Sequence, residues 1–313
     1  MILKDPFLAL CSNRATLPKT NSKYGGPEDW LHNSNLTTKN LFGITFDFFI
    51  DWSSNSCSNE VWIKKILSEK YNYDYLIQNH IEIFANSFEP DYFKYLSAFS
   101  KFYNIEPYFI IYNDNLNWSN DDSLLLKVHI SYKKGHNRLN TLFTFSKIKL
   151  TDFKTEIRSN SGGPVRIGSK GLIYGTSLLE CALSKTDSLY PGDADLVIIK
   201  PTGELECILE YKKHNLNTSI SLQKLSNYYP RPDGRKYNRL AILRDFLDEN
   251  LPILNIYYPT KPNFSEGRLE LLKGSNNNLS TNAASNFSLE EVKKNPIFLL
   301  DKILKAVTYH NNL

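Results

Sequence analysis

The chain has 313 residues, of which 41% are apolar and 22% are charged. With 18 Phe and 19 Tyr against only 14 Gly and 14 Pro, it is neither a disordered nor a collagen-like sequence, and its length allows one large domain or two ordinary ones. Lysine and arginine number 37 against 33 aspartate and glutamate, so the net charge of +4 permits a polyanionic partner without requiring one.

The first half of the chain, residues 1–158, predicts an α+β region that serves as a recognition or accessory domain. The helix expected at 59–70 follows from apolar residues between Trp62 and Leu67 that would share one helical face. The other expected elements are strands at 41–50, 106–112, 123–132 and 140–150, with a turn at 134–137, and a helix at 91–103. This half contains no reactive motif, and the chain shows no internal repeat.

A glycine- and serine-rich stretch, residues 159–171, predicts the boundary of a second region over 159–273. Its expected elements are, in order, a helix at 176–185, strands at 195–200 and 205–212, a helix at 218–229, a strand at 238–243, a helix at 244–250 and a strand at 252–258. Residues 274–313 read as a polar linker, 274–286, and a terminal helix ending near 308. Ser288 and Glu291 form a capping box at its start.

The cysteines and the N-terminus favour a cytoplasmic protein. The four cysteines are far apart in the sequence, which argues against a structural zinc site and against a compact disulfide framework; they are Cys11, Cys57, Cys181 and Cys207. The N-terminal segment is a poor signal peptide, and no apolar run approaches the roughly 20 residues of a membrane span. We therefore expect no membrane contact.

Chemistry-bearing side chains are concentrated in two strand-like runs at 191–214. If Thr202-Gly203 forms a two-residue hairpin loop, Asp195 faces Glu210, and Asp193 and Lys212 project from the same side of the hairpin. Two carboxylates held this close repel each other, and a hard divalent cation such as Mg²⁺ removes the conflict. A metal ion with a lysine beside it suits phosphodiester hydrolysis.

An aspartate before an apolar strand, then a hairpin, then Glu210-Tyr211-Lys212, resembles the motif of the PD-(D/E)XK nuclease superfamily. The resemblance covers about residues 173–258. It implies an α/β fold with a restriction-endonuclease-like αβββαβ core, and Mg²⁺-dependent cleavage of DNA, less often RNA, with Mn²⁺ as a substitute metal. The family has one more strand before its aspartate, for which only 184–192 is available here.

The resemblance also implies roles for individual residues. Asp195 and Glu210 would be metal ligands and Lys212 the catalytic lysine. Glu180 matches the glutamate that many members carry on the first helix, as a further catalytic metal ligand. Some members have a Gln–Tyr motif on the next helix; Gln223 with Tyr228 matches it with a spacing one residue longer.

The charge distribution supports a nucleic-acid partner, and we expect that partner to be DNA. From Lys212 to Arg244 the chain has eight basic side chains against Asp233 alone. The residues expected to contact nucleic acid are Lys213, Gln223, Lys224, Arg231, Arg235, Lys236 and Arg239. A homodimer is left open.

These observations predict a Mg²⁺-dependent endonuclease, of a restriction or defence type. One alternative is a polymerase-beta-type nucleotidyltransferase, in which Asp193 and Asp195 would be the paired carboxylates and Gly175-Thr176-Ser177 the upstream Gly-Ser. The two functions differ in whether Glu210 or Asp193 shares a metal ion with Asp195. The other alternative is a non-catalytic nucleic-acid-binding module.

Overall fold

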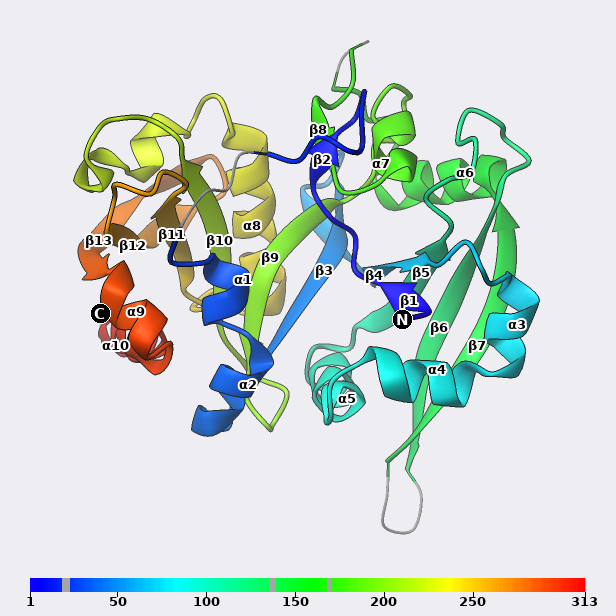
Figure 1. The fold of residues 1–313 in the computed structure, drawn as a ribbon, viewed down its shortest axis with the longest axis horizontal. Helices are drawn as coiled ribbons and strands as arrows, with labels where there is room; N and C mark the ends of the chain where they lie inside the picture. The colour runs from blue at the N-terminus through cyan, green and yellow to red at the C-terminus, as the bar shows by residue number, and fades with distance from the viewer. Residues whose placement is uncertain (19–22, 135–138, 168–169, 313) are drawn as a thin grey trace. The chain divides into compact units, whose positions relative to one another are not determined.

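The computed structural model describes residues 1–18, 23–134, 139–167 and 170–312 (Figure 1). It is a mixed α/β protein with two compact units, each containing both parallel and antiparallel strand pairs. The first unit comprises Met1–Pro18 and Phe46–Gly192, and the second comprises Lys19–Thr45 and Asp193–Leu313. The units therefore do not divide at the boundaries expected after residues 158 and 273, because an early segment of the chain folds with the C-terminal part.

The strands of the first unit follow the order β3, β4, β5, β6, β7. Its strands are β1 (Leu3–Lys4), β2 (Ala9–Leu10), β3 (Phe42–Asp51), β4 (Ser56–Leu67), β5 (Glu106–Tyr112), β6 (Leu124–Lys134), β7 (Leu139–Lys149) and β8 (Tyr174–Gly175). Its helices are α3 (Tyr73–Gln78), α4 (His80–Ser87), α5 (Tyr92–Tyr103), α6 (Leu150–Asn160) and α7 (Leu178–Leu183). Only β4 and β5 are parallel in this order, and α3, α4 and α5 form the crossover between them.

Strand β4 occupies the segment expected to be a helix, so that prediction is wrong. β4 lies between β3 and β5, and nearly every side chain from Val61 to Leu67 is buried. A strand that is covered on both faces reads as a continuous apolar run, which sequence periodicity cannot distinguish from a buried helix. The other expected elements of this half are confirmed within a few residues; most of the expected turn at 134–137 lies outside the described residues.

The second unit has the strand order β13, β12, β11, β10, β9, followed by the start of β3, Phe42–Thr45. Its other strands are β9 (Gly192–Ile199), β10 (Leu205–His214), β11 (Ile253–Pro259), β12 (Glu266–Ser275) and β13 (Asn278–Ser288). Its helices are α1 (Pro27–Trp30), α2 (Asn33–Leu36), α8 (Gly234–Leu247), α9 (Leu289–Lys294) and α10 (Ile297–Asn311), with short 3-10 turns η1 (Thr37–Lys39), η2 (Ile220–Leu222) and η3 (Leu225–Asn227). β10 and β11 are parallel and are joined by η2, η3 and α8.

The crossover between β10 and β11 differs from the sequence prediction. The expected strand at 238–243 and helix at 244–250 are one helix, α8, because Tyr237, Leu240 and Leu247 are buried at helical spacing. The expected helix at 218–229 is replaced by η2 and η3. The Leu225 amide donates to the Glu270 carboxylate at 3.0 Å and is therefore not used in a continuous helix.

The C-terminal region is more regular than the sequence predicts. The expected linker at 274–286 is mostly β13, an edge strand whose exposed polar side chains read as a linker. The expected capping by Ser288 is confirmed, since its side chain accepts a hydrogen bond from the Glu291 amide. The terminal helix is split into α9 and α10 at Asn295 and Pro296, because proline disfavours a helical conformation in the residue before it.

The strand expected before Asp195 does not form from residues 184–192. Within that stretch, Ser188 makes only an isolated bridge to Val165 before β9 begins. The place beside β9 is taken by β3, whose first residues fold with the second unit. Residues 159–273 therefore do not contain the strand that an αβββαβ core would require before Asp195, and the neighbour of β9 on that side is β3.

The first unit contains a disulfide between Cys11 and Cys181, with 5.6 Å between their Cα atoms. Sequence spacing argued against a disulfide framework, because the two cysteines are 170 residues apart. The pairing of β2 with β8 brings the two segments together, and this contact is invisible in a linear reading. In the part of the chain that the structure describes, no helix combines the length and the apolar character needed to cross a membrane.

Candidate active site

The β9–β10 hairpin places Asp195 next to Glu210. Leu196 pairs with Leu209, as expected, and Asp195 and Glu210 follow directly. The expected two-residue loop is wrong, because Lys200 pairs with Glu204 through an N–H···O bond of 2.8 Å, which leaves three residues in the turn. A bulge between Leu205 and Cys207 absorbs the difference, and the expected register is restored before the strands reach the carboxylates.

The paired register of β9 and β10 ends at Leu196 and Leu209, and the Asp195 side chain makes the next contact between the two strands. Its Oδ2 accepts a hydrogen bond of 2.6 Å from the Tyr211 backbone amide. The Thr45 hydroxyl of β3 donates to the Asp195 carbonyl oxygen at 2.7 Å. Asp195 is therefore fixed through both its backbone and its carboxylate, and its second carboxylate oxygen, Oδ1, faces the Lys236 ammonium.

Lys236 lies at the centre of the cluster. Its Nζ is 2.9 Å from Glu210 Oε1, 3.3 Å from Asp195 Oδ1 and 3.6 Å from Asp193 Oδ1. Lys236, which the sequence predicts to contact nucleic acid, lies in the first turn of α8, among three carboxylates. The Lys236 ammonium therefore lies between the Asp195 and Glu210 carboxylates and forms an ion pair with both.

Lys212 is held beside Glu210 by a second set of contacts. Its Nζ is 3.2 Å from Glu210 Oε1 and 2.7 Å from Asp233 Oδ2. It also lies 5.2 Å and 5.1 Å from the ring centres of Tyr228 and Tyr237, which is cation–π distance. Sequence reasoning missed these three partners, although Asp233, as the only acid in a basic stretch, was a usable signal.

Gln223 supports this arrangement from below the surface. Its side chain is buried, and its amide oxygen accepts a hydrogen bond of 2.7 Å from the Tyr228 hydroxyl. The buried Glu270 carboxylate accepts bonds from the Asn255 amide at 3.1 Å, the Tyr257 hydroxyl at 2.5 Å and the Leu225 amide at 3.0 Å. These bonds join η3 to β11 and β12, so the segment that carries Tyr228 is held in place over Lys212.

Burial and neighbouring charges shift the pKa values of Glu210 and Lys236. Glu210 is 0% exposed, and burial together with the Asp195 charge raises its pKa from 4.5 to about 8, against the opposing charges of Lys236 and Lys212. Burial lowers the pKa of Lys236, but Asp193, Asp195 and Glu210 outweigh it and hold that pKa well above its ordinary value. Burial and the Asp195 charge therefore favour the protonated form of Glu210, and the surrounding carboxylates favour the charged form of Lys236.

The donor atoms suit a hard cation that also binds substrate. Within the described ranges, no three His, Cys, Asp or Glu side chains converge closely enough to hold a metal ion by themselves. Mg²⁺ characteristically uses one or two carboxylates and completes its shell with water and phosphate oxygens. Asp195 and Glu210 fit this pattern, because Glu210 Oε2 is buried and accepts no hydrogen bond among the described residues.

Glu180 lies in a different environment from the cluster. It belongs to α7 of the first unit, and its Oε2 accepts hydrogen bonds of 2.6 Å from both the amide and the hydroxyl of Thr176. The residues that the structure gathers around Lys236 are Asp193, Asp195, Glu210 and, through Glu210, Lys212, all in the second unit.

The remaining basic residues lie on or near the surface of the crossover segment. Lys224, Arg231 and Arg235 are exposed, whereas Lys213 and Arg239 are partly buried. Arg235 and Arg239 are one helical turn apart on α8, and burial with the nearby Arg235 charge lowers the pKa of Arg239 to about 10.

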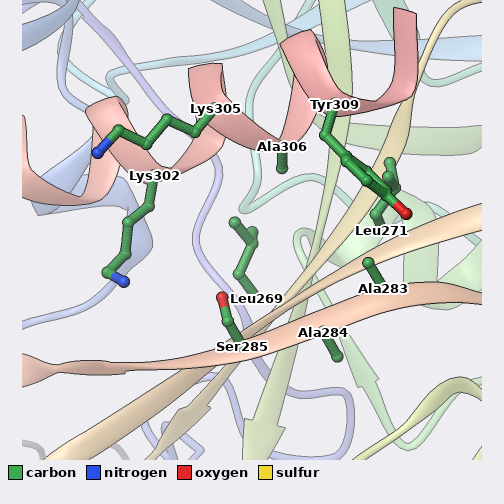
Figure 2. A pocket seen from close by; sticks show the side chains of 9 residues that line it. All are labelled: Leu269, Leu271, Ala283, Ala284, Ser285, Lys302, Lys305, Ala306 and Tyr309. Atoms are coloured by element: carbon green, nitrogen blue, oxygen red, sulfur yellow. The ribbon is translucent and has the colours of Figure 1, made fainter. Parts of the chain in front are cut away.

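A cavity of about 280 Å³ lies between α10 and the strands β12 and β13 (Figure 2). Leu269, Leu271 and Ala306 form apolar walls, with Lys302 and Tyr309 at its sides. The two leucines flank Glu270 on β12 and therefore point to the face opposite the carboxylate cluster.

No protein-family model, no curated protein and no solved structure matches this chain.

Proposed function

We propose that the protein is a Mg²⁺-dependent endonuclease of the PD-(D/E)XK type, which hydrolyses phosphodiester bonds of nucleic acid, with DNA as the preferred substrate. The observation that carries the proposal is the shared cation position: the Lys236 ammonium lies 2.9 Å from Glu210 and 3.3 Å from Asp195. Two facing carboxylates that share one cation, with Lys212 alongside, make up the set of groups that metal-assisted hydrolysis requires.

Mg²⁺, when bound, would neutralise charge on the scissile phosphate and lower the pKa of water. Asp195 would hold it through the oxygen directed to Lys236, while the Tyr211 amide keeps that carboxylate oriented. Glu210 must lose its proton to serve as the second ligand. Lys236 must move aside, which its position at the start of a helix and its 32% exposed side chain allow.

Lys212 would act on the reacting groups directly. Asp233 and the two tyrosine rings fix its ammonium next to Glu210, where it can stabilise negative charge that develops on the phosphate. In the reaction, the oxygen of water bonds to phosphorus, the bond from phosphorus to one sugar oxygen breaks, and the departing oxygen is protonated. The exposed Lys224 and Arg231 would contact phosphates outside the reacting position.

The geometry supports the nuclease over the nucleotidyltransferase. A transferase would pair Asp195 with Asp193, whose side chain is 44% exposed and 3.6 Å from the Lys236 ammonium. Glu210 is 1% exposed by side chain and closer, at 2.9 Å. A transferase would also leave Glu210 and Lys212 without a role, although their side chains are the least exposed of the cluster, at 1% and 11%.

The test is cleavage of supercoiled plasmid, single-stranded DNA and RNA in Mg²⁺ by the wild type and by Glu210→Gln and Lys212→Met. We expect both variants to lose at least about 100-fold in rate while they still bind DNA in Ca²⁺, measured by fluorescence anisotropy. Glu204→Gln, on the exposed turn before the same strand, is the matched control and should cleave normally. Full Mg²⁺-dependent cleavage by both site variants would refute the proposal, and DNA binding without any cleavage by the wild type would indicate a non-catalytic module.

A further inference from the structure

The two compact units run through the same succession of elements (Figure 1). In the first, the antiparallel pair β3–β4 leads through a helical crossover to the parallel strand β5, then to antiparallel β6 and β7, and to α6, which begins directly after β7. In the second, β9–β10 leads through a crossover to parallel β11, then to antiparallel β12 and β13, and to α9, which begins directly after β13. The units are therefore two versions of one fold.

An equivalent backbone hydrogen bond in each unit provides a starting point for aligning their residues. The amide of Leu150, the first residue of α6, donates to the carbonyl of Ser123, which precedes β6, at 2.8 Å. The amide of Leu289, the first residue of α9, donates to the carbonyl of Ser265, which precedes β12, also at 2.8 Å. The two serines, like the two leucines, therefore occupy equivalent positions.

Strand register carries this alignment across the first unit. Val128, five residues after Ser123, pairs with Phe109 on β5. Phe109 pairs in parallel with Ile63 on β4. Continuing the β3–β4 register by one residue, Ile63 faces Phe46.

The same path through the second unit ends at the carboxylate cluster. Glu270, five residues after Ser265, pairs with Asn255 on β11. Asn255 pairs in parallel with Glu210 on β10, and, continuing the β9–β10 register by one residue, Glu210 faces Asp195. Each residue on this path corresponds to one residue on the path through the first unit.

The comparison shows that apolar side chains fill the carboxylate positions of the first unit. Phe46 stands where the second unit has Asp195, and Ile63 stands where it has Glu210. Both are buried, and the Phe46 ring lies 5.6 Å from that of Phe99 on the crossover helix α5. The positions that correspond to the polar residues behind the cluster are apolar too. These positions therefore offer no oxygen ligand to a cation.

The lysine is the one charged group of the motif that both units have. Lys65 corresponds to Lys212, and each ammonium pairs with an aspartate: Lys65 with Asp5, and Lys212 with Asp233. The Lys65 ammonium lies 4.7 Å from the Phe88 ring centre in the crossover, as Lys212 lies over the crossover tyrosines. The first unit thus keeps the frame and the lysine of the site and lacks the carboxylates that bind metal.

We infer that the first unit is a second, non-catalytic copy of the site-bearing fold, so that one chain contains one metal-dependent centre and cuts one strand of a DNA duplex per binding event. This inference rests on the proposed nuclease function of the Asp195–Glu210 cluster. It makes the protein a nicking enzyme, because a double-strand break needs a second hydrolysed phosphodiester bond on the opposite strand, and Phe46 and Ile63 provide no carboxylate at the two equivalent positions of the first unit.

The first experiment counts metal sites without using cleavage. Mn²⁺ is titrated into the full-length chain and into Asp195→Asn, with free Mn²⁺ measured by electron paramagnetic resonance. We expect all specific Mn²⁺ binding to be lost in the variant. Specific binding that survives in Asp195→Asn would overturn the inference. If Mn²⁺ binds in the expected way and no nucleic acid is cut, the proposed function fails while the assignment of a single metal centre stands.

The second experiment follows supercoiled plasmid held in excess over protein. We expect open-circular DNA to accumulate before linear DNA, with Lys65→Met cutting at the wild-type rate and Lys212→Met slowed by at least about 100-fold. Ile63→Val, a milder change at the position of Glu210, replaces Lys65→Met if that variant does not fold. Linear DNA as the first product would overturn the inference, as would a loss in a folded Lys65→Met or Ile63→Val comparable to that in Lys212→Met.

Discussion

Replacing Glu210 by glutamine should change how the stability of the metal-free protein depends on pH. The pKa of Glu210 is raised from 4.5 to about 8 by burial and by the neighbouring Asp195 charge, so between these values the folded protein holds a proton that the unfolded chain releases. Stability rises with pH only where the unfolded state binds more protons. The wild type must therefore lose stability as the pH rises from the lower value through the higher one, and Glu210→Gln lacks this component.

The size of the effect follows from the two pKa values. At about 1.4 kcal/mol per pKa unit, the wild type should lose roughly 3 kcal/mol more than Glu210→Gln between about pH 5.5 and about pH 8. The assay is urea unfolding in EDTA at both pH values. Glu204→Gln, whose carboxylate is 44% exposed, is the control and should follow the wild type. Parallel stability profiles for the wild type and Glu210→Gln would refute the account of the buried carboxyl group.

Two further changes have defined outcomes. Lys236→Met removes the cation between Asp195 and Glu210, and because the Lys236 side chain is 32% exposed, the loss of stability in the metal-free protein should lie at the lower end of the range for a broken buried ion pair, about 3 kcal/mol. Added Mg²⁺ should raise its melting temperature more than that of the wild type, and equal Mg²⁺ shifts would contradict the shared cation position. Replacing Cys11 and Cys181 by serine opens a loop with a sequence separation of 170 residues and should lower the free energy of unfolding by about 2–5 kcal/mol under oxidising conditions. Unchanged urea unfolding would contradict it.

Local pattern was sufficient to predict the hairpin that carries the site. The apolar, β-like runs at 195–200 and 205–212 predicted both strands, and the two-residue spacing of Glu210 and Lys212 placed them on one face. The predicted turn was one residue too short, yet the predicted pairing of Leu196 with Leu209 is confirmed. The bulge between Leu205 and Cys207 offsets the extra residue in the turn. The sequence pattern reveals neither of these local features, and for this reason the turn length was wrong although the pairing was right.

The long-range part of the site could not be read from the sequence. Lys236 lies in a basic stretch, and its carboxylate partners are far earlier in the chain. A count of charges along the sequence therefore predicts a contact with nucleic acid and misses the ion pairs. The repetition of the fold was also hidden. The offset between equivalent positions shrinks from 149 residues, for Phe46 and Asp195, to 139 residues, for Leu150 and Leu289, and the polar residues of one copy are apolar in the other. No constant period or shared motif remains to be detected.

The bulge between Leu205 and Cys207 makes the tip of the β9–β10 hairpin a place for engineering. A bulge can take up an extra residue before the strands reach the carboxylates, so the length of the tip at 201–203 and the spacing of Asp195 and Glu210 are set independently. A fluorescent amino acid or a short peptide tag introduced at Thr202 would then sit on the same hairpin as the reacting groups without displacing them. Such a probe could report the arrival and departure of substrate in real time.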